Sequence, residues 1–379
     1  MKQQEYIGFN SVRNLKKIFT QHRPKKIFLV TGRNSYERSG SKNAIEPILS
    51  GHDSVHFYDF EVNPKVRDIE KGIKIFKENN CDFVIAVGGG SVIDVAKAVN
   101  ILAANDIKPD DCVKNKKPFE KKGVALAAIP TTSGSGSEAT KFAVIYIDKI
   151  KYSLDQDYIL PDYAIVDPQF TMNLPPYITA CSGMDALSQA VESYWCVNST
   201  DESKKYAKEA IKLVMDSLAD AVNNPSENSR GEMARAAYLA GKAVSISKTT
   251  ACHSISYPIT SYFDVSHGHA VALTLAQMLL YNSQVTEDDL LDKRGVGYVK
   301  NTINEIASIL GSSSTEDASK KITALMADIG LKTKLIELKI KTQEDMNIII
   351  KHGFNPERVK NNPRKLTEEA LRRILHNIN

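Results

Sequence analysis

Three consecutive glycines directly after a short apolar run are the feature that most constrains the fold of this chain. Residues 83–87 read Phe-Val-Ile-Ala-Val, a pattern typical of a strand buried on both faces of a parallel sheet. Gly88, Gly89 and Gly90 then allow positive φ and a close backbone approach, and Ser91 begins a predicted helix whose free N–H groups favour an anion. The segment predicts a strand-turn-helix unit that binds a pyrophosphate, although a plain tight turn would also use glycine.

A second loop of similar chemistry follows the apolar run at residues 124–129. Its residues 130–140 contain a proline, several hydroxyl side chains and two glycines. Thr131, Thr132 and Ser135 are the candidates in this loop for contacting a ribose or a phosphate. An exposed serine- and glycine-rich linker is the alternative, but linkers seldom follow a buried strand and a proline.

The character of the sequence changes once along the 379 residues. Up to residue 177, short apolar strands such as residues 26–31 alternate with helical segments, which predicts an α/β dinucleotide-binding domain over residues 1–177. Beyond it, apolar residues recur every three or four positions and predict an all-α domain over residues 178–379. The helices expected there cover residues 203–221, 231–247, 303–310, 318–329 and 367–375.

The composition, 42% hydrophobic and 25% charged, is that of an ordinary globular enzyme. No apolar run approaches ~20 residues and the first residues lack a signal peptide, so we expect a cytoplasmic protein without a membrane span. The five cysteines show no Cys-x-x-Cys spacing, which favours reduced thiols over disulfides. A net charge of only +4, with scattered lysines, makes nucleic acid an improbable partner.

Four polar residues in the second half form a candidate metal site. Asp185 and Gln189 are four residues apart, so their side chains would share one face of a helix. His253 and His267 would have to come from other elements. A carboxylate, an amide and two imidazoles can hold a divalent ion, but capped helix ends and satisfied polar groups would use the same residues.

Five separated motifs occur in the order found in the iron-containing (group III) alcohol dehydrogenase family. The chain resembles this family over nearly its whole length. The resemblance implies a dehydroquinate synthase-like fold, with a dinucleotide-binding α/β domain, a helical metal- and substrate-binding domain and the site in the cleft between them. It also implies an NAD(P)-dependent oxidoreductase that reduces a small aldehyde to a primary alcohol, and a homo-oligomer, with a dimer as the first expectation. The motifs are residues 88–97, 130–138, 160–168, 183–187 and 267–268.

In this family the metal ligands are usually one aspartate and three histidines. Asp185, His253 and His267 match that pattern, but Gln189 occupies a histidine position. An amide oxygen is neutral and harder than an imidazole nitrogen, so we expect weaker metal binding and a preference for ions that accept oxygen ligands. Fe²⁺ is the ion that the resemblance implies, Zn²⁺ and Mn²⁺ are alternatives, and an empty site is compatible with the same residues.

The first predicted strand suggests the choice of cofactor. It ends in Gly32-Arg33, where many NAD-preferring relatives carry an aspartate near the adenosine ribose. Glycine makes room for a 2′-phosphate and arginine supplies a bidentate cation, so NADPH is expected ahead of NADH. A solvated turn arginine is the alternative. The resemblance implies further cofactor contacts from Asp94, Lys97 and Lys151.

Two residues near the predicted ligands are candidates for catalysis. Tyr257 lies four residues after His253, where many relatives have a histidine near the substrate. A phenol can donate a proton, although its usual pKa of about 10 suits that role less well at neutral pH. A tyrosine packed against the following proline is the alternative. His269, two residues after His267, is the other candidate, as a substrate contact or as a group that supports the ligands.

The substrate is predicted from a finer resemblance. Residues 185–202, 248–258 and 267–275 look most like those of the phosphonoacetaldehyde reductases, so the expected reaction is phosphonoacetaldehyde to 2-hydroxyethylphosphonate. A buried phosphonate needs cations or N–H donors. The candidates are Lys248 first, then Arg358 and Arg364.

Three other functions remain open from the sequence. A general short-chain alcohol dehydrogenase or aldehyde reductase would share the same motifs. A dehydroquinate synthase-like lyase would share the fold and the glycine loop and would use NAD without net oxidation. A nucleotide-binding regulatory protein that has lost its metal is the third, and the glutamine at position 189 invites it.

Overall fold

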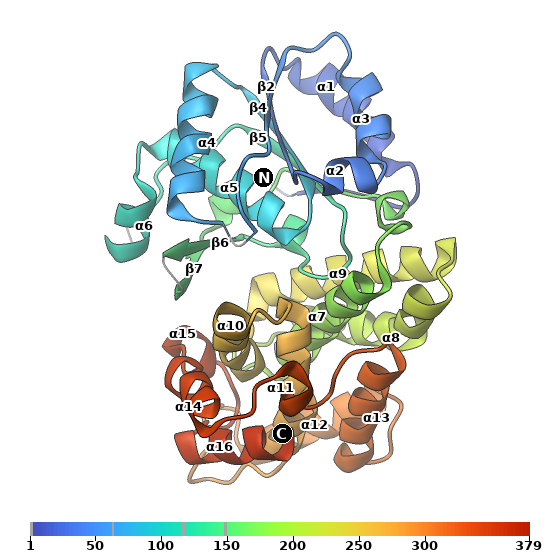
Figure 1. The fold of residues 1–379 in the computed structure, drawn as a ribbon, viewed down its shortest axis with the longest axis vertical. Helices are drawn as coiled ribbons and strands as arrows, with labels where there is room; N and C mark the ends of the chain where they lie inside the picture. Colours follow the sequence, from blue (N-terminus) through green and yellow to red (C-terminus); the bar gives the residue numbers. More distant parts are fainter. Residues whose placement is uncertain (1–2, 63, 116–117, 148–149) are drawn as a thin grey trace. The chain divides into compact units, whose positions relative to one another are not determined.

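The computed structural model describes residues 3–62, 64–115, 118–147 and 150–379. The chain divides into two compact units, residues 1–174 and residues 175–379 (Figure 1). The first unit is built around a parallel sheet and the second is helical, so the fold class expected from the sequence is confirmed.

The first unit contains a six-stranded sheet in the order β1-β8-β5-β4-β2-β3, and every pair of neighbours in it is parallel. Strands β6 and β7 form a separate antiparallel hairpin, which the sequence patterns did not predict. The strands are β1 (Gln4–Ile7), β2 (Ile27–Thr31), β3 (Ser54–Phe57), β4 (Phe83–Gly88), β5 (Ala125–Pro130), β6 (Phe142–Ile147), β7 (Ile150–Asp155) and β8 (Tyr163–Val166).

Helices cover both faces of this sheet, and this explains the unbroken apolar runs of the central strands. In β2, Phe28 and Val30 pack on the side of helices α4 and α5, whereas Ile27 and Leu29 pack on the side of α1 and α3 (Figure 1). The α-helices of this unit are α1 (Leu15–His22), α2 (Ser35–Arg38), α3 (Ser41–Leu49), α4 (Val66–Glu78), α5 (Gly90–Asn105) and α6 (Pro109–Asn115). Its short 3₁₀ turns are η1 (Ser11–Asn14), η2 (Ser137–Ala139), η3 (Asp157–Ile159) and η4 (Pro168–Thr171).

The strand order creates a switch point between β2 and β4. The chain leaves β2 toward β3 on one side and leaves β4 toward β5 on the other. Thr31 pairs with Val87, and Val87 pairs with Ile129, so the carboxyl ends of β2, β4 and β5 lie at one edge. Ligands of open parallel sheets bind outside the carboxyl ends of strands at such a point. The loops after these three strands therefore lie where a dinucleotide is expected.

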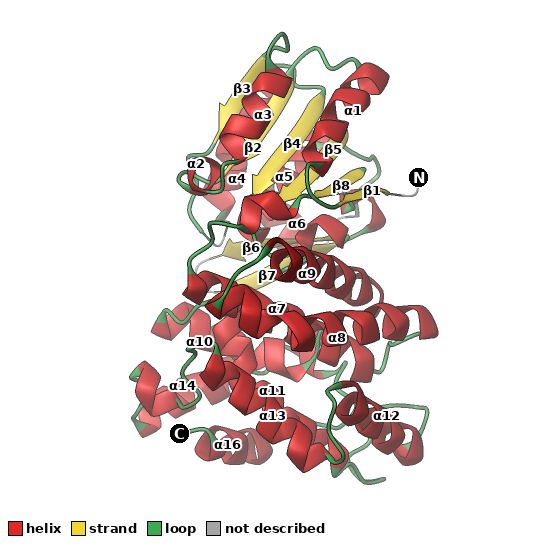
Figure 2. Cartoon of the chain, turned by 90° about the vertical axis from the view of Figure 1, so that its right-hand side faces the viewer, coloured by secondary structure: helices red, strands yellow, loops and turns green. Residues whose placement is uncertain are grey.

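The second unit is helical throughout, apart from one isolated bridge between Leu290 and Arg364. Helix α7 packs against α8, α9 and α11, and α11 also packs against α10 and α13 (Figure 2). All five helices expected from periodicity are present, within α8, α9, α12, α13 and α16 or overlapping them. The helices are α7 (Pro176–Trp195), α8 (Asp201–Asn223), α9 (Glu227–Ser247), α10 (Ala251–Phe263), α11 (His267–Ser283), α12 (Val296–Ile309), α13 (Thr315–Asp328), η5 (Leu335–Leu338), α14 (Gln343–His352), α15 (Pro356–Val359) and α16 (Glu368–Asn377).

Within the described part of the chain, no helix combines the length and the apolar character that crossing a bilayer requires.

Candidate metal centre and cofactor-binding loops

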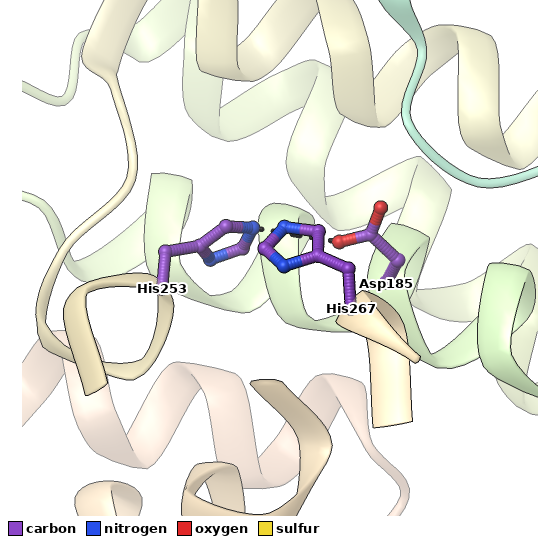
Figure 3. Close-up of side chains that lie close together, drawn as sticks. All are labelled: Asp185, His253 and His267. Carbon is purple, nitrogen blue, oxygen red and sulfur yellow. Dashed lines mark ion pairs between the residues drawn. The ribbon is translucent and has the colours of Figure 1, made fainter. Parts of the chain in front are cut away.

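Three of the four predicted metal ligands come together from three helices of the second unit. Asp185 lies in α7, His253 lies in the first turn of α10, and His267 is the first residue of α11. One ligand atom from each lies within 4.8 Å of the other two (Figure 3). Nε2 of His253 is 3.4 Å from Oδ1 of Asp185, and the two imidazole centroids are 5.5 Å apart.

A glycine allows α7 and α11 to approach closely enough to form this site. A Cβ at Gly268 would lie 1.9 Å from the carbonyl oxygen of Cys181 and 2.9 Å from Cβ of Asp185. Such distances are far inside van der Waals contact, so only glycine fits here without moving a helix backbone. Gly268 thereby places His267 beside the turn of α7 that carries Asp185.

Gln189 occupies the fourth position, one helical turn beyond Asp185. Its side chain is buried and lies close enough to the Asp185 carboxyl to help lower the pKa of that group. Oε1 of Gln189 and Oδ1 of Asp185 are both buried and have no hydrogen-bond donor among the described residues. Leaving a buried acceptor unpaired costs about 1–3 kcal/mol. Two such oxygens beside two imidazoles form a donor set that fits a divalent cation. We use the name metal cluster for Asp185, Gln189, His253 and His267.

Two ionisable side chains of the metal cluster have strongly shifted pKa values. Burial by itself raises the pKa of Asp185, but the His253 ring and the charge of His267 outweigh burial and bring the pKa to about 2. Burial by itself lowers the pKa of His253, but the carboxylates of Glu192 and Asp185 outweigh burial and raise the pKa to about 9. The carboxylate is therefore ionised at neutral pH and attracts positive charge to the centre.

Sequence reasoning missed Glu192, which is fully buried and lies beside the cluster. Its Oε2 is hydrogen-bonded to Nδ1 of His253, the ring nitrogen that does not face Asp185. The spacing of these polar residues could have identified it. Positions 185, 189 and 192 are four and three residues apart, so their side chains lie along one face of α7.

Tyr257 lies next to the cluster, one turn beyond His253 on α10. Its ring is nearly parallel to that of His267, with centroids 6.3 Å apart and an interplanar angle of 23°. Nε of Arg358 donates a hydrogen bond of 3.2 Å to the phenolic oxygen. The structure thus brings together a predicted proton donor and a predicted substrate-binding cation.

The other candidates from the sequence have different surroundings. His269 is buried, with Nε2 2.7 Å from the carbonyl oxygen of Lys332 and Nδ1 3.4 Å from the hydroxyl of Tyr177, and it is outside the cluster. Arg364 binds Asp289 at 2.7 Å and the carbonyl of Tyr281 at 2.6 Å. These contacts connect structural elements, and they give neither residue a role at the metal cluster.

Lys248 ends α9 with a φ of +74°, a left-handed conformation that is uncommon for lysine. It is half-buried and directly precedes Thr249 and Thr250, which lead into α10. Its backbone therefore belongs to the turn that brings His253 into place.

In the first unit, the glycine loop and the second polar loop lie against each other. A Cβ at Gly90 would meet Oγ of Ser135 at 2.7 Å, and one at Gly89 would be 3.4 Å from Oγ1 of Thr132. The N–H of Thr131, whose side chain is buried, donates to the carbonyl of Gly88 at 3.0 Å.

Helix α5 begins at Gly90, next to Ser91, so its free N–H groups face these loops. Of the two properties of glycine considered from the sequence, positive φ is not used, because none of the three glycines has a positive φ. Close packing explains the glycine at position 88, where a Cβ would lie 2.4 Å from Cγ2 of Val92. The turn thus needs glycine for space rather than for backbone conformation.

The side chains of Asp94 and Lys97, which lie on α5, form hydrogen bonds with the second loop and with the start of β6. Nζ of Lys97, a residue 1% exposed, donates to the carbonyl oxygens of Ser137, Thr140 and Phe142. Oδ1 of Asp94 accepts from Oγ of Ser137 at 2.5 Å. The two side chains thus hold the loop and the start of β6 in place, and the cofactor contacts expected for them stay a prediction.

Burial shifts the pKa values of these side chains. It lowers the pKa of Lys97 to about 8 and raises that of Asp94, which also feels the charge of Lys151 on β7. Burial also raises the pKa of Glu138, beside the loop, to about 7.

Arg33, the residue expected to bind a 2′-phosphate, has an acidic partner. Its guanidinium lies 2.6 Å from a carboxylate oxygen of Asp59, which follows β3, and both side chains are exposed. Lys71 binds the same carboxylate. Sequence reasoning missed Asp59, because the strands that precede the two residues, β2 and β3, become neighbours only in the folded sheet.

Comparison with known proteins identifies the class. Residues 3–168 match the model of the iron-containing alcohol dehydrogenase family, and residues 179–379 match that of its C-terminal domain. The chain belongs to this family, and it is an oxidoreductase that interconverts aldehydes and alcohols with a nicotinamide cofactor. The resemblance recognised from its motifs is confirmed, and family membership favours the dehydrogenase over the lyase.

Individual relatives differ in their substrates. The chain is 35% identical to long-chain-alcohol dehydrogenase 1 of Geobacillus thermodenitrificans over 290 residues, covering 75% of this chain and 72% of that one. It is 32% identical to phosphonoacetaldehyde reductase of Streptomyces viridochromogenes over 305 residues, covering 78% and 75%. The crystal structure of sulfoacetaldehyde reductase from Bifidobacterium kashiwanohense in complex with NAD⁺ matches with a TM-score of 0.89 and 31% identity, covering 99% and 96%.

Proposed function

We propose that this protein reduces a small anionic aldehyde to the primary alcohol, with phosphonoacetaldehyde to 2-hydroxyethylphosphonate as the first candidate reaction. The observation that carries the catalytic part is the pair of buried oxygens, on Asp185 and Gln189, that lack a hydrogen-bond donor beside His253. The anionic part is supported by a guanidinium, that of Arg358, next to the tyrosine that stacks on His267.

The metal cluster would hold one divalent ion, and a residue beside it would donate the proton that the product alcohol needs. When bound, the ion polarises the carbonyl oxygen and the reduced nicotinamide supplies a hydride to the carbonyl carbon. The product alcohol then needs one proton on its oxygen, and Tyr257 is the proposed donor. Because Arg358 donates to the phenolic oxygen, the hydrogen of the Tyr257 hydroxyl is directed toward another acceptor.

Fe²⁺ is the first candidate ion, and Zn²⁺ and Mn²⁺ are the alternatives. Two oxygen and two nitrogen donors form a harder set than one oxygen and three nitrogens, so we propose weaker binding of Zn²⁺ than a three-histidine site would give. Metal content after purification without a chelator tests this, and it also tests the alternative of a nucleotide-binding protein without a metal.

Arg358 and Lys248 are the proposed cations for the phosphonate. Arg358 is the stronger candidate, because its partner Tyr257 stacks on a cluster histidine. Lys248 is supported by its place in the turn before α10. Arg364 and His269 are not included, since their described contacts lie elsewhere.

We propose NADPH ahead of NADH, with the glycine and Ser91 N–H groups at the start of α5 holding the pyrophosphate. Gly32 supports this choice, because it leaves room where an acidic side chain would repel a 2′-phosphate. Asp59 works against it, since its carboxylate already pairs with Arg33. Measuring kcat/KM for both cofactors in wild type and Arg33→Ala decides the point, and NADPH use should fall more than NADH use.

Sulfoacetaldehyde is the second candidate substrate, and one observation favours it. The reductase of that name covers nearly the whole chain at 31% identity. A sulfonate carries one negative charge, and a phosphonate carries one or two, so the same cations would serve either group. A general short-chain aldehyde reductase is the third candidate.

One assay separates these candidates. NADPH and NADH oxidation would be followed with phosphonoacetaldehyde, sulfoacetaldehyde, lactaldehyde, succinic semialdehyde and butyraldehyde, each with Fe²⁺, Zn²⁺, Mn²⁺ or no added metal. Strong preference for either anionic C2 aldehyde supports the proposal. A broad profile would assign a general aldehyde reductase.

Single substitutions test the binding of the anionic group separately from the reduction step. Arg358→Ala and Lys248→Ala should each raise KM for phosphonoacetaldehyde about 10-fold or more, because each removes a charge-assisted contact, and should leave KM for butyraldehyde nearly unchanged. Arg358→Ala should also lower kcat for both aldehydes, because it removes the donor to Tyr257. Arg372→Ala is the matched control, since Arg372 is an exposed residue of α16 paired with Glu368. Equal losses for charged and neutral aldehydes would remove the anion-binding argument.

We also propose a cytoplasmic homodimer. Five buried, unpaired cysteines among the described residues support a reducing compartment. The dimer rests on the resemblance, and light scattering of the purified protein tests it.

A further inference from the structure

Glu192 is a fully buried carboxylate that accepts hydrogen bonds only from the start of α10 among its described contacts. Its Oε1 accepts from the N–H of Thr250 at 3.2 Å, from Oγ1 of Thr250 at 2.7 Å, from the N–H of Cys252 at 2.8 Å and from the N–H of His253 at 3.4 Å. Its Oε2 is bonded to Nδ1 of His253. One carboxylate therefore contacts both the backbone that carries His253 and the ring itself.

These contacts fix which nitrogen of His253 keeps its proton when the ring is neutral, as it must be to bind a metal. An ionised carboxylate can only accept hydrogen bonds, so Nδ1 must be the donor to Glu192. In the neutral ring, Nε2 is then the nitrogen with the free lone pair. Nε2 is also the atom that lies 3.4 Å from Oδ1 of Asp185, inside the metal cluster.

The position of the carboxylate is itself stabilised. The N–H groups at the start of a helix carry partial positive charge, and three of them meet Oε1 of Glu192. Trp195, one turn further along α7, donates from Nε1 to Oγ1 of Thr250 at 2.9 Å. Glu192 and Trp195 thus both form hydrogen bonds with Thr250, which fixes the start of α10 against α7.

We propose that Glu192 is a positioning residue of the metal centre, which holds His253 in the tautomer and orientation that present Nε2 to a divalent ion. The inference rests on the proposed function, since it assumes an ion at the metal cluster. A carboxylate behind a ligating histidine raises the basicity of the ligand, and losing such a partner typically costs 10- to 100-fold in metal affinity. That support would partly compensate for the neutral amide at position 189.

Glu192→Gln separates this role from simple capping of α10. The amide oxygen can still accept from the backbone N–H groups, but an amide NH₂ facing Nδ1 makes that nitrogen an acceptor and moves the proton to Nε2. We expect the Zn²⁺ and Mn²⁺ dissociation constants, measured by calorimetry on chelator-treated protein, to rise about 10- to 100-fold.

Thr250→Val is the matched control. It removes one donor to Oε1 and leaves the bond from Oε2 to His253 in place. It should lower the melting temperature and change the metal dissociation constants less than threefold. Equal metal affinity in wild type and Glu192→Gln, with lower thermal stability, would reduce Glu192 to a helix cap and overturn the inference.

The wild-type protein offers a readout that needs no substitution. In protein labelled with ¹⁵N-histidine and loaded with Zn²⁺, the NMR signals of His253 should show a protonated Nδ1 and an unprotonated Nε2. A protonated Nε2, or an unprotonated Nδ1, would contradict the inference even if Glu192→Gln failed to fold. No metal bound by wild type would instead count against the proposed function itself.

Discussion

In the α/β unit, the candidate cofactor site is formed by backbone, and the side chains near it serve mainly to hold two loops in place. In the helical unit, the candidate metal site is formed by side chains from three helices, and the backbone serves to bring the helices together. Gly88 and Gly268 mark the difference. The first makes room for a turn beside Val92, and the second makes room for one helix against another.

The buried polar side chains of the two units differ in the same way. Lys97 and Asp94 are buried and bonded mostly to backbone and hydroxyl groups, so their charges support a loop. Asp185 and Gln189 keep buried oxygens without donors, so their electron pairs remain available to a cation. The bonds of Lys97 and Asp94 thus hold a loop in place, whereas the two acceptors of the metal cluster remain open to a cation.

The largest effect is expected from Gly268→Ala. The new methyl group would overlap the carbonyl of Cys181, so α7 and α11 must separate and carry Asp185 away from His267. We expect bound metal to be lost and kcat/KM to fall about 1,000-fold, which corresponds to about 4 kcal/mol of transition-state stabilisation. Metal analysis and steady-state kinetics measure both.

Gly297→Ala is the control for that prediction. Gly297 lies in α12, and a Cβ there meets no atom within 4 Å. It should keep full activity and gain up to about 1 kcal/mol of stability. Full metal occupancy in Gly268→Ala would show that the close approach of the helices is not what builds the centre.

Glu138→Gln tests the buried charges of the α/β unit through pH. The pKa of Glu138 is raised from 4.5 to about 7 in the folded protein, so the folded state binds a proton more tightly than the unfolded state. The stabilisation that this proton gives is complete below pH 4.5 and is lost as pH rises toward 7, at most about 3 kcal/mol. The variant cannot titrate, so its free energy of unfolding should change less between pH 4.5 and 7. Denaturant unfolding of both proteins across this range gives the answer, and parallel curves would contradict it.

Gly88→Ala should weaken the cofactor site and leave the metal site unchanged. Its methyl group would overlap Val92 and open the turn at the start of α5. We expect KM for the nicotinamide cofactor to rise about 30-fold, near 2 kcal/mol, with metal content unchanged. Loss of metal in this variant would mean that the two sites are not independent.

Gln189→His should have the smallest effect. Replacing the amide by imidazole gives the donor set of one aspartate and three histidines. We expect Zn²⁺ affinity to rise about 10-fold, because an imidazole nitrogen binds Zn²⁺ better than a neutral amide oxygen. Competition with a chromogenic chelator measures this, and unchanged affinity would show that residue 189 does not bind the metal.

The parts of the molecule predicted from sequence are those encoded by contiguous residues. The run before Gly88 identified β4 because both faces of that strand are buried, and helical periodicity identified α8 and α9. The β6–β7 hairpin was missed although β6 reads Phe-Ala-Val-Ile-Tyr-Ile, whereas β7 is more polar and half exposed. The candidate metal ligands, which lie far apart in sequence, were predicted from the family motifs and, for Asp185 and Gln189, from their helical spacing.

Other features depend on contacts that sequence spacing cannot show. Arg33 pairs with Asp59 because β2 and β3 are neighbours in the sheet. Lys97 donates to carbonyl oxygens of the second loop, which lies 40 residues or more further along the chain. Glu192 could have been noticed from its position on α7, but its bonds to the start of α10 follow only from helix packing.

The central claim is that Asp185, Gln189, His253 and His267 hold a divalent ion on which aldehyde reduction depends. The most direct measurement is an anaerobic titration of chelator-treated protein with Fe²⁺, while bound metal and aldehyde-dependent oxidation of NADPH or NADH are followed in the same samples. We predict that activity rises in proportion to bound metal and reaches its plateau at one ion per chain. Full activity without metal, or a protein that binds no ion, would contradict the account.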